Sequence, residues 1–324
     1  QDPQSLAVQC VRTAHWLKHA PDTHSHALWT LGDTHYPEAL LQLPDPPLML
    51  YVAGQTERTL GHAIAIVGSR NPTPQGAQTA TQFGEALGAR GLCVVSGMAL
   101  GVDGAAHQGA LRGNTSRTCW HTVAVVGTGL DRVYPRQHQT LATEIATHGL
   151  LMSEYPLGTP PLAHHFPQRN RLIAALGLGT LVVEAALKSG SLITAKMALD
   201  LNREMMAIPG SIHATQSHGC HALIRQGAKL VENAQDVLEE LQLASPSQAS
   251  LLTNDHDSAD QDLPDDTHPL LVHMGFAPVS LDALRARSGL DTATLQAALL
   301  SLELDGALAR LPGGLFQQLA PKPS

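Results

Sequence analysis

Short apolar runs alternate with amphipathic stretches through the middle of the chain. The runs are continuous rather than alternating with polar residues, so both faces of each predicted strand are expected to be buried. They cover residues 63–68, 92–97, 122–127, 150–154, 180–185 and 204–210. Stretches with helical spacing lie between them, such as 76–91 and 191–202. This alternation predicts an α/β fold with an extended, doubly wound, Rossmann-like parallel sheet as its core.

The segments around this core have other patterns. Residues 1–60 predict a small helical unit and then an extended segment, because the prolines at 46 and 47 block helix continuation. Residues 61–243 carry the alternation and form the predicted Rossmann-like domain. Residues 244–266 hold few bulky side chains and a run of aspartates, which predicts an acidic, flexible linker.

The last part of the chain, residues 267–324, predicts a winged-helix module. Three helical patterns cover 268–275, 280–289 and 292–306, and a hairpin pattern then turns at 312–314. Ser280 and Thr292 are the expected N-caps of the second and third helices, and Gly289 and Gly306 are the expected stops.

Composition sets limits on the function. A net charge of −8 argues against a nucleic-acid ligand, but residues 254–266 alone hold six aspartates and no lysine or arginine. The acidity therefore says little about a binding surface. Four distant cysteines without a CxxC pair predict reduced thiols in a cytoplasmic protein. We find no signal peptide, no apolar run of 18 residues and no metal-like spacing of the scattered histidines. We therefore expect no membrane span, metal site or cofactor.

Most of the predicted strands end in small, polar or turn-forming residues. These ends are 68–70, 96–98, 127–129, 153–155 and 208–210. In an open parallel sheet the carboxyl ends line one crevice, where ligands bind. Glycine permits close approach of a ligand to the backbone, and free N–H groups at helix starts attract anions. A glycine can also simply end a strand, but five such loops at one edge favour a ligand site.

Basic and aromatic residues follow some of these strands. Arg70 comes directly after Gly68 and Ser69, where a guanidinium suits phosphate contact; the alternative is a surface salt bridge. Within residues 164–176, Phe166 precedes Arg169, Asn170 and Arg171 at the start of a helical stretch. Cations for phosphates beside a ring for base stacking are typical of single-strand recognition. The alternative makes Phe166 a core residue and the arginines surface charges.

Lys188, Ser189, Gly190 and Ser191 precede another helix and form a candidate phosphate cradle. No Walker A motif is present, so nothing supports NTP hydrolysis. Four carboxylates and one histidine near the strand ends could perform acid–base chemistry, or could hold loops by accepting backbone hydrogen bonds, which we favour. They are Asp103, Asp131, Glu154, Glu184 and His107. We therefore identify no catalytic set and expect a binding protein, not an enzyme.

Several long motifs, in order, resemble the DprA/Smf (DNA-processing protein A) family over nearly the whole chain. They are YPEALLQLPDPPLMLYVAG, AIVGSR, VSGMALGVDGAAH, VVGTGLDRVYP, SEYPLGTPP, FPQRNRLIA, VVEAALKSGSLITA and AIPG. Departures stand at His221, where the family pattern has asparagine, and at His138; they concern the rim of the pocket. The resemblance implies a Rossmann-like domain that dimerises and binds single-stranded DNA. It also implies protection of that DNA and its delivery to the RecA recombinase, in natural transformation for bacteria that import DNA.

The same resemblance implies a basic pocket made by Arg70 of the GSR turn and by Arg169 and Arg171 of FPQRNR. Lys188 and Ser189 of the KSGS segment would lie beside it. These are residues that the charge and helix-start patterns also select.

Two other functions compete with this one. Cytokinin-activating phosphoribohydrolases carry a PGGxGTxxE motif, which Gly179, Thr180 and Glu184 echo without the leading Pro-Gly-Gly and with altered spacing. A transcriptional regulator would read duplex DNA through a basic recognition helix. The third helical pattern of the C-terminal module has no lysine or arginine and holds Glu303 and Asp305. Phosphate attraction would be poor, so we expect this module to contact protein or to regulate.

Overall fold

The computed structural model describes residues 3–243, 268–274 and 278–319. The predicted linker, 244–266, lies outside the described residues. Contacts divide the chain into two compact units, and each is described by itself below. The first holds nearly all of residues 3–243, and the second holds the elements after residue 267.

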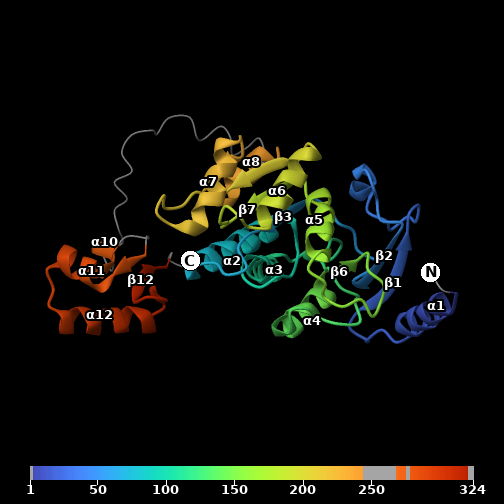
Figure 1. The fold of residues 1–324 in the computed structure, drawn as a ribbon, viewed down its shortest axis with the longest axis horizontal. Helices are drawn as coiled ribbons and strands as arrows, with labels where there is room; N and C mark the ends of the chain where they lie inside the picture. The colour runs from blue at the N-terminus through green and yellow to red at the C-terminus, as the bar shows by residue number, and fades with distance from the viewer. Residues whose placement is uncertain (1–2, 244–267, 275–277, 320–324) are drawn as a thin grey trace. The chain divides into compact units, whose positions relative to one another are not determined.

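The first unit is built on a nine-stranded sheet in the order β1-β2-β6-β5-β4-β3-β7-β8-β9 (Figure 1). Its strands are β1 Ser25–Thr30, β2 Met49–Gly54, β3 Ala63–Val67, β4 Cys93–Ser96, β5 Thr122–Val125, β6 Leu150–Ser153, β7 Gly179–Val182, β8 Glu204–Ala207 and β9 Lys229–Leu230. Its α-helices are α1 Pro3–Lys18, α2 Pro74–Ala89, α3 Val102–Gly113, α4 Gln139–His148, α5 His165–Leu176, α6 Ser191–Asp200, α7 His218–Arg225 and α8 Ala234–Glu240. Short 3-10 helices cover Glu38–Gln42, Arg136–His138 and Thr215–Ser217.

The seven strands that follow β2 in this order, β6-β5-β4-β3-β7-β8-β9, pair in parallel. All six predicted apolar runs form strands within this parallel region. Alternate residues of one strand face different helices, which explains the continuous apolar runs. Val123 and Val125 pack in one cluster with Ile173 of α5, whereas Ala124 packs with Ile145 of α4 on the other face.

The N-terminal edge of the sheet differs from the prediction. Residues 1–60 do begin with a helix, but β1 and β2 then join the main sheet as antiparallel strands. Tyr51 of β2 lies opposite Ser153 of β6, and β2 thus extends the parallel sheet as an antiparallel strand. The sheet is therefore mixed at this edge, and the predicted extended segment is part of the core.

Glycines let the helices on one side pack closely. A side chain at Gly84 of α2 would meet the backbone of Ala106, and one at Gly109 of α3 would meet the backbone of Thr81. Gly113 faces the backbone of Glu85 in the same way. Small residues thus bring α2 and α3 together at backbone distance, in a chain whose aromatic content is only 3 %.

The second unit is a winged-helix domain with a three-stranded sheet in the order β10-β12-β11. Its elements are α10 Pro269–Met274, β10 Val279–Ser280, α11 Leu281–Ser288, α12 Thr292–Leu304, β11 Leu308–Leu311 and β12 Leu315–Gln318. Ser280 caps α11 as predicted, and Gly289 ends it in the left-handed conformation. The expected N-cap of α12 is wrong by one residue. Asp291 accepts hydrogen bonds from the N–H groups of Ala293 and Thr294, and Thr292 is already helical.

Within the described residues, no helix is both long and apolar enough to pass through a membrane.

A buried histidine links α3 to the sheet. His107 is fully buried, and its Nδ1 lies 2.7 Å from Oγ1 of Thr122. The Thr122 hydroxyl donates to the carbonyl oxygen of Val94, so Nδ1 of His107 must be the donor in their contact. Nε2 of His107 has no hydrogen-bond partner among the described residues. Burial, with smaller contributions from His138 and Arg169, lowers the pKa of His107 to about 3.

The fold should therefore lose stability in mild acid through His107. Its neutral form is stabilised in the folded state, so this contribution is present above the ordinary histidine pKa of 6.5 and is lost as the pH falls below it. Between about pH 7.5 and about pH 5.5 we expect wild type to lose about 1.4 kcal/mol more than His107→Asn. Urea unfolding curves at both pH values measure this difference. An equal loss in the two proteins would contradict the assignment.

Candidate nucleic-acid interface

A cavity of about 520 Å³ opens beside the carboxyl ends of β3, β4 and β7. The turn after β3, the starts of α3 and α5 and the segment leading into α6 surround it. Ten of the eleven residues predicted for binding line this cavity, and Arg171 does not. The ten are Gly68, Ser69, Arg70, Phe166, Arg169, Asn170, Lys188, Ser189, Gly190 and Ser191. The structure thus brings residues 68–70 together with residues 166–170, which are more than ninety positions later in the sequence. Residues 188–191 complete the same lining.

Exposed basic groups stand beside an aromatic ring in this cavity. The guanidinium carbon of Arg70 lies 5.4 Å from the centre of the Phe166 ring. Arg70 and Lys188 are both exposed, and neither forms an ion pair within the described part of the chain. The expected alternative for Arg70, a surface salt bridge, is therefore absent among those residues. An exposed cation on an aromatic face is suited to a phosphate and a neighbouring base.

The start of α6 forms another wall. The hydroxyls of Ser189 and Ser191 lie 2.7 Å apart, and no acidic residue stands in the first turn of the helix. Gly190 precedes the helix without a side-chain cap, and the space where its Cβ would lie is empty. Hydroxyls and N–H groups at a helix start favour an anion. Gly68 has a different role, because a Cβ there would collide with Val102 of α3.

Arg169 also lines the cavity, but it is buried, with only 3 % of its surface accessible. Its Nη1 donates to the carbonyl oxygen of Gly97 at 2.8 Å and to that of Val125, and its Nε donates to Oδ1 of Asn170 at 3.1 Å. Burial lowers the pKa of Arg169 to about 10, against the opposing effect of the Asp103 charge. It therefore stays protonated at neutral pH. Its hydrogen bonds tie α5 to the ends of β4 and β5, so it positions the site.

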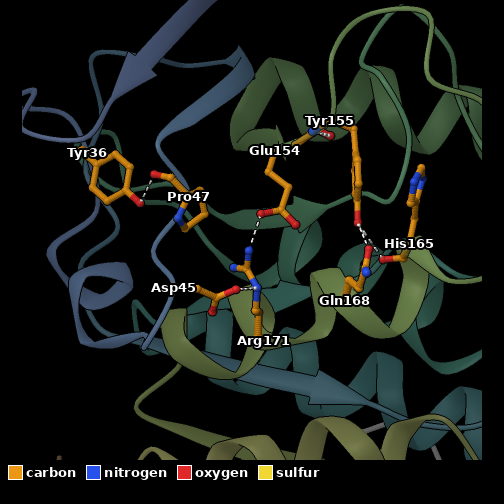
Figure 2. A network of polar contacts seen from close by, with 9 residues as sticks. Tyr36, Asp45, Pro47, Glu154, Tyr155, His165, Gln168 and Arg171 are labelled. Atoms are coloured by element: carbon orange, nitrogen blue, oxygen red, sulfur yellow. Dashed lines mark hydrogen bonds and ion pairs between the residues drawn. The ribbon is translucent and has the colours of Figure 1, made fainter. Parts of the chain in front are cut away.

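Arg171 does not line the cavity, and Figure 2 shows its guanidinium directed at Glu154 and Asp45. Its Nη2 lies 2.6 Å from Oε2 of Glu154, and its Nε lies 3.5 Å from Oδ2 of Asp45. Two residues apart on a helix, Arg169 and Arg171 differ in direction by about 200°, so they cannot face the same site. The inclusion of Arg171 in the basic pocket is not supported. Burial raises the pKa of Glu154, and the charge of Arg171 opposes that effect.

A network of polar contacts fixes the start of α5, and the sequence analysis did not identify it. Figure 2 shows the Tyr155 hydroxyl directed at the His165 carbonyl oxygen, at 3.3 Å, and at Oε1 of Gln168, at 3.2 Å. The rings of Tyr155 and His165 stack with centres 4.0 Å apart, and Nδ1 of His165 lies 3.2 Å from the Gly127 carbonyl oxygen. In the sequence, the only signals for these contacts were the polar residues that end the predicted strand at 150–154 and the adjacent histidines at 164 and 165. Together these contacts hold the turn that carries Phe166.

Two of the carboxylates near the strand ends hold loops by accepting backbone hydrogen bonds. Oδ2 of Asp103 accepts hydrogen bonds from the N–H groups of Gly97 and Ala99, and Oδ1 of Asp131 accepts one from Gly158. The predicted role in holding loops is confirmed for these two aspartates. Asp103 lines the cavity, whereas Glu184 and His107 are not among its lining residues.

The two histidines at which the chain departs from the family pattern also lie outside the lining of the cavity. Nδ1 of His138 lies 3.0 Å from the Met98 carbonyl oxygen, and Nε2 of His221 lies 2.9 Å from that of Gly210. Both bind backbone, so they act on the loops rather than on the cavity directly.

Comparison with known proteins supplies the family. Residues 27–242 match the family "DNA recombination-mediator protein A", and residues 254–314 match the "DprA winged helix domain". Protein Smf of Escherichia coli is 40 % identical over 292 residues, which are 90 % of this chain and 77 % of that protein.

Two solved structures share the fold. DNA processing protein A of Streptococcus pneumoniae superposes with a TM-score of 0.64 and 40 % identity, over 71 % of this chain and 77 % of that one. DNA processing protein A of Helicobacter pylori, whose structure was described for its single-stranded DNA binding mode, gives a TM-score of 0.58 and 32 % identity. That match covers 66 % of this chain and 95 % of the other. The chain belongs to the DNA recombination-mediator protein A family, the DprA/Smf group of DNA-processing proteins.

Proposed function

We propose that this protein binds single-stranded DNA in the cavity, protects it, and loads the RecA recombinase onto it during DNA processing and natural transformation. We place this role in the cytoplasm and assign it to a homodimer that acts by binding rather than by catalysis. The observation that carries the proposal is the exposed Arg70 guanidinium over the Phe166 ring, in one cavity with Lys188 and the hydroxyls of Ser189 and Ser191.

The mechanism is phosphate capture with base stacking as a smaller contribution. Arg70 and Lys188 supply exposed positive charge, Ser189 and Ser191 supply hydroxyls, and Gly190 supplies a backbone N–H. Phe166 offers one face on which a base can stack. Every nucleotide has a phosphate and every base has a flat face, so binding should tolerate most sequences. Each neutralised phosphate releases counterions, so binding should weaken as salt rises.

Removal of the two exposed cations tests this mechanism. We expect Arg70→Ala/Lys188→Ala to weaken binding of a labelled oligo-dT at least tenfold. It should also reduce the slope of log affinity against log salt by about 0.7 for each phosphate that the variant no longer neutralises. Fluorescence anisotropy at several salt concentrations, with duplex competitor, measures both quantities.

The matched control is Lys18→Ala/Arg90→Ala, which removes the same charges from exposed positions outside the cavity. Its affinity and salt slope should equal those of wild type. Equal weakening in both double variants, or equal affinity of wild type for duplex and single strand, would overturn the proposed site.

The C-terminal winged-helix domain should contribute little to this affinity. The outward face of α12 exposes Leu300 and Leu304, by 58 % and 80 %, and the helix carries no lysine or arginine. Such a surface suits protein contact or regulation better than phosphate binding. Deletion of 267–324 should leave the affinity for oligo-dT within a few-fold of wild type, whereas a decrease near a hundredfold would place a DNA contact in this domain.

Loading of RecA requires its own test. We expect the protein to speed RecA-dependent ATP hydrolysis on DNA coated with single-strand-binding protein, and the cation-deficient double variant to lose this effect. Light scattering on the same sample should give twice the chain mass of 34.3 kDa. Tight DNA binding without any acceleration would leave a DNA-binding protein that does not load RecA. A monomer mass would remove the homodimer from the proposal.

A further inference from the structure

One carboxylate lies in a cavity that is otherwise suited to anions. Asp103 lines the cavity together with Arg70, Arg169 and Lys188, and it is 7 % exposed. A carboxylate repels a phosphate, so it cannot serve phosphate capture. Burial raises the pKa of Asp103, and the charge of Arg169 opposes this most strongly. A buried acid in this place needs hydrogen-bond donors around it.

The protein supplies those donors to one oxygen of Asp103 only. Oδ2 accepts from the N–H of Gly97 at 3.1 Å and from that of Ala99 at 3.4 Å, which fixes the direction of the carboxylate. Within residues 3–243, no hydrogen bond reaches Oδ1, and Asp103 forms no ion pair. Oδ1 is therefore free to accept from a ligand in the cavity.

Asn170 supplies the opposite capacity. Its Oδ1 accepts from Nε of Arg169 at 3.1 Å, which leaves its amide NH₂ to donate elsewhere. Asn170 lies one helical turn after Phe166 on α5, so amide and ring share one side of that helix. Both residues line the cavity. The lining of the cavity therefore offers a base both an acceptor, on Asp103, and a donor, on Asn170.

We propose that the cavity reads the edge of one base, with Asp103 accepting and Asn170 donating, and that it prefers guanine. This preference rests on the proposed binding of single-stranded DNA. Guanine carries two adjacent donors, N1–H and the N2 amine, beside the O6 acceptor. The two adjacent N–H groups can both donate to the one unoccupied carboxylate oxygen, Oδ1 of Asp103, and O6 matches the Asn170 amide. No other DNA base has two donors beside an acceptor on that edge. The rest of the strand is held by its phosphates without regard to sequence.

Wild-type protein tests the preference without any substitution. Competition anisotropy would compare short oligothymidylates that hold one central guanine, adenine, hypoxanthine or 7-deazaguanine. We expect guanine to bind about tenfold more tightly than thymine alone, as for one well-paired base edge. Hypoxanthine, which lacks the N2 amine, should lose most of this gain. The 7-deaza base keeps the same edge and should retain it.

Asp103→Asn then assigns the preference to the carboxylate, with Asp200→Asn as the matched control at an exposed position outside the cavity. Each protein's affinity for plain oligothymidylate serves as its own reference, and the ratio of guanine to thymine affinity should fall to about one in the Asp103 variant. The control should keep the guanine preference.

The outcomes separate this inference from the proposed function. Tight binding of all oligonucleotides with equal affinity, or a guanine preference that survives in Asp103→Asn, would overturn base reading and leave single-strand binding intact. Absence of binding to any oligonucleotide would overturn the proposed function itself. Should Asp103→Asn fail to fold, the comparison of guanine with hypoxanthine in wild type still decides.

Discussion

The buried guanidinium of Arg169 joins the elements on which the cavity depends. From α5 it donates to the carbonyl oxygens at the ends of β4 and β5, and its charge acts on Asp103 at the start of α3. A cation buried to this degree needs such partners, because an unpaired buried charge costs several kcal/mol. The same bonds hold α5 at the depth where Phe166 and Asn170 reach the cavity. The position of these cavity-lining groups thus follows from a residue whose hydrogen bonds are made within the protein.

The basic residues around the site fall into two groups by their partners. Arg169 donates hydrogen bonds to backbone carbonyl oxygens, and Arg171 forms an ion pair with Glu154. These contacts hold α5 on two different sides. Arg70 and Lys188 are exposed and free of ion pairs within the described residues. A free, exposed cation can neutralise a phosphate with little desolvation, whereas a paired one would first have to break its contacts. Of these four basic residues, only Arg70 and Lys188 are therefore suited to the proposed phosphate contact.

Sequence reasoning was strongest where one physical rule decides the structure. Continuous apolar runs mark strands that are buried on both faces, and β3 and β5 followed that rule. It failed for β1, whose short, partly exposed sequence SHALWT shows no such run, so its pairing with β2 was not predicted. In the candidate site, residue types identified segments that line one cavity. Helical periodicity could have separated Arg169 from Arg171, but the burial of Arg169 depends on the carbonyl oxygens of distant strands.

Gly97 and Arg169 are complementary in size as well as in hydrogen bonding. The place where a side chain would stand on Gly97 is taken by the guanidinium of Arg169, and the ring of Phe166 lies against Gly127 in a similar way. Gly97 cannot gain a side chain while Arg169 stays, whereas a side chain at Gly127 would require the Phe166 ring to shift slightly. A change at Gly97 thus requires a change at Arg169, so this pair should vary together across relatives, and the pair of Gly127 and Phe166 less strictly. The record of that joint variation would trace how the site has been remodelled as a unit during evolution.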